Sequence, residues 1–419
     1  MNKYIRILFL LIVYTSYMLL NLVYPDVVWF AFFSMLAFII SKPIFLLSPK
    51  TIIFAYYFLW FGLSPIFAER YKDINFDNDY VSLTYTMLAT SYIVLLITCE
   101  LFLNETKYLS HRKREVLPIK NIYIVFFSTL TLLFLFLYVQ VTGGISYWAS
   151  NLDRAFLTRQ GAGTYYLGFT LFLPLTLFLF GINVKKVLPL ILVSILVLIL
   201  SPFIGSKQKI IIMFLILFVT KIYMNKLDVK NVVVFLTPVI FLFVLGNYFR
   251  NASWMEYSDI LAYSLNYFDT LDSLFIVLRD YSGFDVMTFF LPFNKLYNLF
   301  TNSDEFFDLS AYLTSIYFPA AWDIRATVQF PIEADLYLSF GFWFGLPFLI
   351  ILCICYIPVY KKCIAQESPI MIYIWFYLFI YLISHLRGGV FLWTDMYVYP
   401  YLLIIYFIFR KKLFYVQQN

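Results

Sequence analysis

The chain has 419 residues, of which 63% are hydrophobic, 22% are aromatic and 13% are charged, and its formal net charge is +6. This composition excludes a water-soluble domain and indicates a protein whose main solvent is the lipid bilayer. The four cysteines and two histidines form no cluster with zinc-site spacing, and the sequence has no Walker loop or dinucleotide-binding fingerprint. We therefore expect neither a metal nor a cofactor.

Apolar runs bounded by charged residues, Pro, Gly or Asn predict about twelve transmembrane helices, because crossing the hydrocarbon takes about 20 residues in helical conformation. In chain order the runs are residues 7–22, 27–40, 52–66, 81–103, 122–141, 165–182, 187–200, 210–220, 232–245, 336–359, 369–384 and 393–409. The predicted fold class is thus an all-α polytopic membrane protein.

The basic residues predict the orientation of these helices. With the N-terminus inside, 19 of the 30 Lys and Arg residues fall on the cytoplasmic side, so the positive-inside rule places both termini in the cytoplasm. Seven of the 11 external cations are Arg, against four of the 19 internal ones. Arg can grip a phosphate or carboxylate at two points, which favours anion binding outside. Ordinary ion pairs with the many external acids are the alternative.

A long external loop separates predicted helices nine and ten. We expect three parts: residues 1–245 with helices 1–9, residues 246–335 as the loop, and residues 336–419 with helices 10–12. The loop carries twelve acidic residues against four basic ones, which argues against nucleic acid as a partner. Carboxylates interleaved with aromatic rings suit sugars, and a solvated acidic surface is the alternative.

Within the loop, residues 259–280 have apolar side chains at helical spacing and contain no Pro or Gly. This pattern predicts an amphipathic helix that lies on the membrane surface or over the mouth of the bundle. Asp269, Asp272 and Arg279 would share one of its faces, either lining a groove or simply facing solvent.

Two further clusters stand at the external ends of predicted helices. In residues 204–209 a small-residue turn precedes a helix that opens beside Lys207, which is an anion site in principle, or a tight turn with snorkelling Lys side chains. In residues 385–395 an imidazole, His385, a guanidinium, Arg387, and a carboxylate, Asp395, come close together along the chain. Ionisable groups at the ends of membrane helices favour a functional role.

These two strings, IGSKQKIIIMFLILF from Ile204 and HLRGGVFLWTDMYVYPYL from His385, together with the twelve helices and the external loop, resemble the O-antigen polymerase (Wzy) family of repeat-unit polymerases. Many members have Arg in the first string where this chain has Lys207. The family's pattern of an Arg followed eleven residues later by Gly in paired external loops is absent here, so the loop-to-loop mechanism does not carry over.

The resemblance implies a metal-independent glycosyltransferase of the bacterial inner membrane. It would join undecaprenyl-diphosphate-linked oligosaccharides into a surface polysaccharide such as O-antigen or capsule, with a chain-length regulator as a partner. Cations would receive the charge of the leaving diphosphate, and a base would take the proton of the acceptor hydroxyl.

The candidate residues follow from these two roles. The candidates for catalysis are His385, Arg387, Asp395 and Asp272, and those for substrate binding are Arg154, Arg159, Lys207, Arg279 and Arg325. The competing functions are a lipid-linked oligosaccharide flippase, although the sequence shows no twofold repeat, and an O-antigen ligase, which would share the layout.

Overall fold

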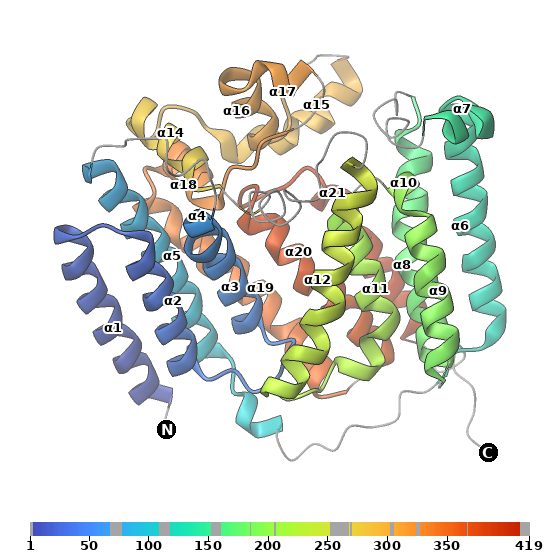
Figure 1. Cartoon of the computed structure of the whole chain (residues 1–419), viewed down its shortest axis with the longest axis horizontal. Helices are drawn as coiled ribbons and strands as arrows, with labels where there is room; N and C mark the ends of the chain where they lie inside the picture. Colours follow the sequence, from blue (N-terminus) through green and yellow to red (C-terminus); the bar gives the residue numbers. More distant parts are fainter. Residues whose placement is uncertain are drawn as a thin grey trace. The chain divides into compact units, whose positions relative to one another are not determined.

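The structure, a computed structural model, describes residues 3–67, 78–108, 118–151, 161–184, 186–204, 207–251, 268, 270–301, 306–323, 327–366 and 368–410. Within these ranges every regular element is a helix and none is a strand (Figure 1). Seven helices are long and apolar enough to cross a membrane: Lys3–Val23, Pro49–Phe67, Asp79–Phe102, Asn121–Val141, Gly163–Asn183, Trp343–Ile364 and Pro369–Leu386. The chain is therefore an all-helical, membrane-embedded protein.

Five shorter apolar helices accompany the seven long ones: Val27–Ser41, Val187–Ile199, Ile212–Ile222, Val229–Phe241 and Asp395–Phe409. Each of the twelve apolar runs predicted from the sequence overlaps one of these helices. The predicted start of the tenth run, at residue 336, is wrong. Residue 336 lies within helix α18 (Ile332–Phe340), and after that helix ends a short 3-10 turn, η7 (Trp343–Gly345), leads into a separate helix, α19 (Leu346–Ile364).

The break between α18 and α19 has a clear backbone cause. Gly341 has a φ of +61° and Phe342 a φ of +66°, so the chain leaves the right-handed helical region at this point. The Gly341 N–H donates to the Tyr337 carbonyl and the Phe342 N–H to the Leu336 carbonyl, at 2.9 and 3.0 Å. The bond from Gly341 to Tyr337 is that of the αL motif, which ends a helix at a residue that glycine fills without strain.

The chain forms two compact units, and the first comprises Met1–Ser110, Ala262–Lys361 and Leu378–Tyr399. Its elements are α1 (Lys3–Val23), α2 (Val27–Ser41), α3 (Pro49–Tyr57), η1 (Phe58–Leu63), α4 (Ser64–Phe67), α5 (Asn78–Phe102), η3 (Glu105–Tyr108), α14 (Leu271–Asp280), η6 (Thr288–Phe293), α15 (Asn294–Thr301), α16 (Leu309–Tyr317), α17 (Pro319–Asp323), α18, η7 and most of α19. Helices α14 to α17 lie at one end of this unit, hereafter the loop end, and the N-terminus lies at the other (Figure 1).

Aromatic rings fill the core of unit 1. The ring of Phe33 stacks on Tyr17 with centroids 4.4 Å apart, and Phe30 packs on Tyr85 at 5.3 Å. These contacts join α1, α2 and α5. Aromatic pairs in such geometries add to the stabilisation that burial alone provides.

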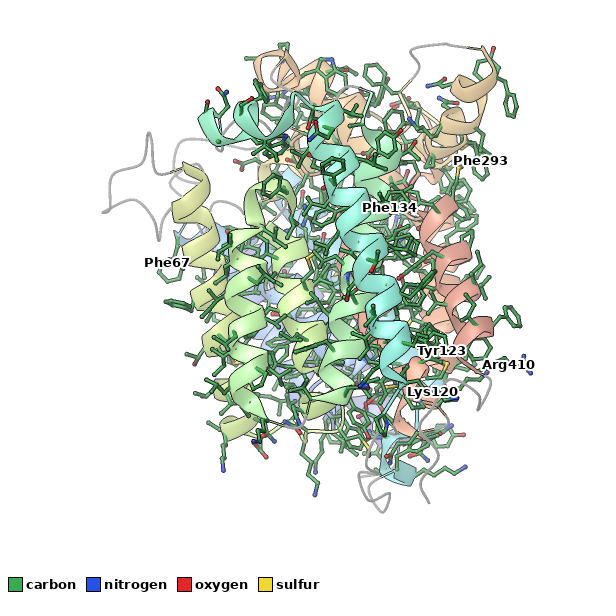
Figure 2. The ribbon with its side chains drawn as sticks, turned by 90° about the vertical axis from the view of Figure 1, so that its right-hand side faces the viewer. Phe67, Lys120, Tyr123, Phe134, Phe293 and Arg410 are labelled. Atoms are coloured by element: carbon green, nitrogen blue, oxygen red, sulfur yellow. The ribbon has the colours of Figure 1, made fainter. Side chains whose placement is uncertain are left out.

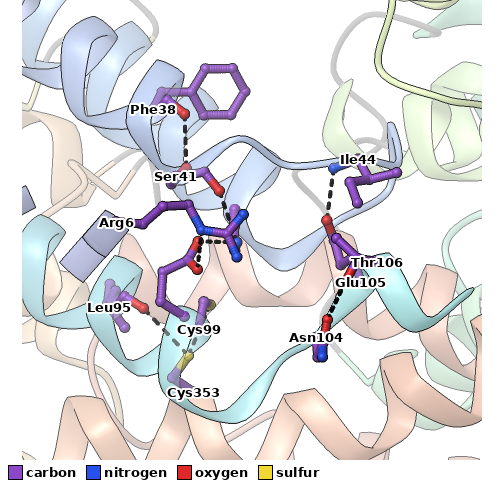
Figure 3. Close-up of polar contacts among 12 residues, drawn as sticks. Arg6, Phe38, Ser41, Ile44, Leu95, Cys99, Asn104, Glu105, Thr106 and Cys353 are labelled. Atoms are coloured by element: carbon purple, nitrogen blue, oxygen red, sulfur yellow. Dashed lines mark hydrogen bonds and ion pairs between the residues drawn. The ribbon is translucent and has the colours of Figure 1, made fainter. Parts of the chain in front are cut away.

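Far from the loop end, unit 1 holds a buried cluster of charges (Figure 3). The Glu100 carboxylate pairs with the Lys50 ammonium, and its other oxygen lies 2.9 Å from Arg6 Nε. Lys50 also donates to the Ser41 carbonyl at 2.9 Å. A buried charge is tolerated when opposite charges and hydrogen bonds surround it, so this cluster fixes α1, α3 and α5 against one another.

The second unit comprises His111–Leu261, Lys362–Tyr377 and Pro400–Asn419. Its elements are α6 (Asn121–Val141), α7 (Gly144–Ser150), α8 (Gly163–Asn183), α9 (Val187–Ile199), α10 (Ser201–Ile204), α11 (Lys207–Ile222) and α12 (Val229–Asn251). Helices α20 (Pro369–Leu386) and α21 (Asp395–Phe409) contribute residues to both units.

Helix α8 is central to the packing of unit 2, because it contacts both α6 and α11. The ring of Phe172 lies 5.6 Å from that of Phe134 on α6. Lys120 and Tyr123 lie at one end of α6, and Arg410, at the end of α21, lies at the same end of the unit (Figure 2). Two basic residues from different helix ends therefore share one end of unit 2.

Candidate active site at the turn between α20 and α21

The candidate site is built on the turn that joins α20 to α21 in unit 1. At the end of α20, the N–H groups of Gly388 and Gly389 both donate to the His385 carbonyl, at 3.2 and 3.0 Å. Gly389 has a φ of +132°, a conformation that side-chain-bearing residues rarely adopt. At the start of α21, Asp395 Oδ2 accepts the Leu392 N–H at 2.8 Å. Residues 387–394 are thus a well-ordered turn, held by hydrogen bonds at both ends.

His385 is 1% exposed, and both of its ring nitrogens have hydrogen-bond partners. Its Nδ1 lies 3.0 Å from the Val390 carbonyl, and its Nε2 lies 3.0 Å from the Tyr399 hydroxyl and 3.4 Å from Asp395 Oδ1. A carbonyl oxygen can only accept a hydrogen bond, so Nδ1 carries the proton of the imidazole. In the neutral ring Nε2 then accepts a hydrogen bond from the Tyr399 hydroxyl. The hydroxyl of Tyr381 donates to the same Asp395 oxygen at 2.7 Å.

Asp335 on α18 supports the turn through hydrogen bonds to its carboxyl group. Its Oδ2 accepts the Val390 N–H at 3.0 Å, and its Oδ1 accepts the Thr288 hydroxyl at 2.5 Å. A Cβ atom on Gly389 would lie 2.8 Å from Asp335 Oδ2, so only glycine allows this close approach. Burial raises the pKa of Asp335 to about 6, although the hydrogen bonds from Thr288 and Val390 act in the opposite direction.

Glu333, two residues earlier on α18, is fully buried beside a pair of tyrosines from α3. The Tyr57 hydroxyl donates to Glu333 Oε1 at 2.6 Å, and the Ser91 hydroxyl lies close to both groups. Glu333 Oε2 accepts no hydrogen bond from the residues that the structure describes. Burial raises the pKa of Glu333 to about 7, against the opposing effect of the Tyr57 hydrogen bond.

Arg387 completes the site from the first position of the turn. Its N–H continues α20 by donating to the Ile383 carbonyl at 3.0 Å, and its side chain is half-buried. The hydroxyl of Tyr56 donates to the Leu386 carbonyl at 2.6 Å and lies within electrostatic range of both Arg387 and Glu333. A guanidinium, a buried carboxyl group and a phenol thus lie near one another at the end of α20.

The structure brings together three of the catalytic candidates predicted from the sequence. His385 and Asp395 are in direct contact, and Arg387 opens the turn between them. Asp272 is half-buried in the first turn of α14, a helix that packs against α5 and α18. Of the predicted amphipathic helix, residues 268 and 270–280 are described; the helix there runs from Leu271 to Asp280, and its apolar face is covered by those neighbours.

The predicted substrate-binding residues have different outcomes. Arg279 is exposed and pairs with its neighbour Asp280, with Nε 2.7 Å from Oδ1, an interaction that raises the pKa of Arg279 and lowers that of Asp280. Lys207 begins α11, but its side chain lies outside the described part of the structure. The remaining candidates, which lie outside the described residues altogether, are Arg154, Arg159 and Arg325. Asp269 lies outside them too.

Sequence reasoning missed the contribution of α18 and α3. Glu333 and Asp335 are two of the twelve acids that the sequence assigns to the external loop, and the sequence pattern gives Tyr56 and Tyr57 no role in a site. One signal was present, because the two acids follow Pro331 and alternate with Ile332, Ala334 and Leu336, an apolar pattern typical of a buried segment. Among the described residues, no group of three or more His, Cys, Asp or Glu side chains could hold a metal ion.

No protein-family model, no curated protein and no solved structure matches the chain. The chemistry of the turn and of α18 is therefore the basis on which a function can be proposed.

Proposed function

We propose that the protein polymerises undecaprenyl-diphosphate-linked oligosaccharide repeat units into a surface polysaccharide, such as O-antigen or capsule. The observation that supports this most strongly is that one turn carries Arg387 and the His385–Asp395 pair. The same turn rests on the buried carboxyl group of Asp335. A cation, a proton acceptor and a rigid support are the parts that glycosyl transfer from a lipid diphosphate requires.

Arg387 would receive the charge of the leaving group. In the proposed reaction a hydroxyl of the acceptor sugar attacks the anomeric carbon of the donor, and the bond from that carbon to the diphosphate oxygen breaks. Negative charge then builds up on the diphosphate, which a guanidinium can bind through two parallel hydrogen bonds. Arg387 is half-buried, so its charge is screened less than that of a fully exposed cation.

The proton of the acceptor hydroxyl would pass to His385. Because His385 is buried and Tyr399 is partly exposed, we propose that the Tyr399 hydroxyl gives its proton to Nε2 as it takes the proton of the sugar. Asp395 would stabilise the imidazolium that results, since its Oδ1 lies 3.4 Å from Nε2. Released undecaprenyl diphosphate and the lengthened glycan are then the products.

We further propose that twelve helices cross the bacterial inner membrane, that both termini are cytoplasmic, and that the site faces outward. Within unit 2, the shared end of Lys120 and Arg410 supports a cytoplasmic C-terminus, because basic segments stay in the cytoplasm (Figure 2). Within unit 1 the site includes residues of α18, a helix that packs against α14 and η6 of the loop. A chain-length-regulating protein would be a partner of this assembly.

The test is to delete the gene and to compare the surface polysaccharide of the deletion strain with those of the parent and a complemented strain on a gel. A polymerase predicts that the ladder disappears while a single repeat unit remains attached. Loss of all repeat units, with lipid-linked precursor accumulating inside, would identify a flippase instead. Accumulation of long polymer on its lipid carrier would identify a ligase.

A further inference from the structure

Residues 284–300 of unit 1 present large apolar side chains outward. Phe284 is 62% exposed and Phe300 is 87% exposed. The exposed side chains that we call the apolar strip are Phe284, Met287, Phe290, Phe293, Leu296 and Phe300. They come from the end of one loop, from η6 and from α15, and Figure 2 labels Phe293 at the loop end of the unit. An apolar surface of this kind marks a site of contact with something other than water.

The strip stands on a rigid base. Phe289, between the exposed residues, is buried, and its ring lies 5.2 Å from that of Phe340 and 5.0 Å from that of Phe348. Phe284 has a φ of +61°, an unfavourable conformation for phenylalanine, and its N–H donates to the Tyr337 carbonyl. The exposure of these rings is therefore fixed by the packing beneath them.

The strip is continuous with the surface of a membrane-spanning helix. The ring of Phe284 lies 6.1 Å from that of Phe344, which is 75% exposed and stands at the beginning of the candidate span Trp343–Ile364. Trp343 is exposed beside it, and Ile351 is exposed two turns further along the same span. Exposed aromatic residues at the end of a membrane helix are typical of the boundary between headgroups and acyl chains.

The charged residues of the segment do not oppose this arrangement. Between residues 284 and 300 the sequence contains two charges, Asp285 and Lys295. Asp285 accepts the N–H of Ser282 at 2.6 Å. The Lys295 ammonium lies over the ring of Phe307, 4.6 Å from its centroid.

We infer that the apolar strip is seated in the leaflet on the loop side of the membrane, where phospholipid headgroups and the first carbons of the acyl chains cover it. The strip continues the lipid-facing surface of α19, and lipid is the occupant that already covers that surface. The segment predicted from the sequence to lie on the membrane, residues 259–280, is a different one, and the described part of it packs against α5 and α18. This inference does not depend on the proposed function.

The experiment uses single-cysteine variants labelled with a fluorophore that reports polarity. The native cysteines Cys99, Cys353, Cys355 and Cys363 are replaced with Ala, and Phe293→Cys and Phe300→Cys are compared with Ile316→Cys. Ile316 on α16 is a matched control, because it is also an exposed apolar residue of the loop but lies outside the strip. The labelled proteins are placed in nanodiscs of phosphatidylethanolamine and phosphatidylglycerol.

We expect the labels at positions 293 and 300 to emit at shorter wavelength, to be quenched at least twofold by headgroup or shallow acyl-chain nitroxide lipids, and to be protected from iodide in the water. The label at position 316 should behave in the opposite way. Iodide quenching of all three labels without nitroxide quenching would overturn the inference. Protection from both quenchers would also overturn it, since protein rather than lipid would then cover the strip.

A second measurement keeps the native cysteines in place. Phe293 is replaced with the photo-reactive residue benzoylphenylalanine, and the irradiated protein is analysed by mass spectrometry for an added phospholipid. Crosslinking to lipid at position 293, but not when Ile316 is replaced in the same way, would support the contact of the apolar strip with lipid. Crosslinks only to protein at position 293 would contradict it.

Discussion

Tyr57 donates its phenolic proton to Glu333 Oε1 over 2.6 Å, so a spanning helix and the short helix α18 meet at a carboxyl group that has no contact with solvent. Burial raises the pKa of this carboxyl group to about 7 from its ordinary value of 4.5. The protonation state of Glu333 therefore changes near neutral pH, and so does the free energy of unfolding.

We expect Glu333→Gln to remove part of the pH dependence of stability. In the folded protein Glu333 keeps its proton up to about pH 7, whereas the unfolded chain ionises near 4.5, so stability falls as the pH rises through this window. The difference corresponds to about 3 kcal/mol. Thermal unfolding in detergent at pH 5 and pH 8 measures it, and the parent should lose more stability between these values than the variant.

Asp285→Asn is the control for this measurement, because Asp285 is an exposed carboxylate. It should leave the pH profile as it is in the parent. If Glu333→Gln also unfolded with the parent's pH dependence, the buried carboxyl group would not be ionising on unfolding in this range.

Removing the guanidinium of Arg387 should abolish most of the proposed polymerase activity. Loss of one group that stabilises developing negative charge lowers a rate by about 10²- to 10³-fold, so Arg387→Ala should lose the polysaccharide ladder. Arg387→Lys should restore it only in part, since Lys lacks the two-point grip on a diphosphate. Lys230→Ala removes an exposed cation of α12 that has no place in the site and serves as the control. A normally expressed Arg387→Ala protein with full activity would exclude Arg387 from the mechanism.

The proposed proton path predicts that Tyr399→Phe and His385→Gln impair the same step. Each should lower the turnover of lipid-linked substrate in vitro by about 10²- to 10⁴-fold, and the double variant should be little worse than the single ones. Tyr356→Phe, which removes a hydroxyl 3.3 Å from that of Tyr399 but not the contact with His385, should have a smaller effect. Independent, multiplying losses in the double variant would show that Tyr399 and His385 do not act together.

Gly389→Ala should disturb the turn far more than Gly388→Ala. Gly389 has a φ of +132°, and a Cβ there would lie 2.8 Å from Asp335 Oδ2. Gly388 does not have a positive φ, and a Cβ there would lie 3.0 Å from the movable Leu392 Cδ2 and 3.1 Å from the Ser384 carbonyl oxygen. We expect a loss of about 1–3 kcal/mol in unfolding free energy for the first variant, with reduced activity. Thermal unfolding of the two purified variants tests this, and equal stabilities would mean that the close approach of Asp335 is not a constraint.

Local features of the site could be predicted from the sequence because its central residues are close along the chain. His385 and Asp395 are ten residues apart, and the Gly pair between them indicates a tight turn. The membrane helices could also be predicted from the sequence, because a backbone in lipid must satisfy its own hydrogen bonds.

The partners of the turn could not be predicted in this way. Tyr57 and Glu333 are 276 positions apart, and nothing in either segment specifies that they meet. The boundary of α19 was placed wrongly because hydropathy continues across Gly341, while the backbone conformation at Gly341 and Phe342 ends the helix. Packing between distant helices decides the first feature, and the local backbone conformation decides the second.

The ion pair between Arg6 and Glu100 also has a consequence for how the protein is made. Arg6 emerges from the ribosome long before Glu100, so α1 enters the membrane with a cation that has no acidic partner. In the orientation proposed above, such a cation keeps the start of the helix on the cytoplasmic side, where synthesis takes place. When α5 arrives, the Glu100 carboxylate pairs with Arg6 through one oxygen and with Lys50 through the other. The charge that orients the first helix during insertion is thus the charge that later fastens it to the bundle.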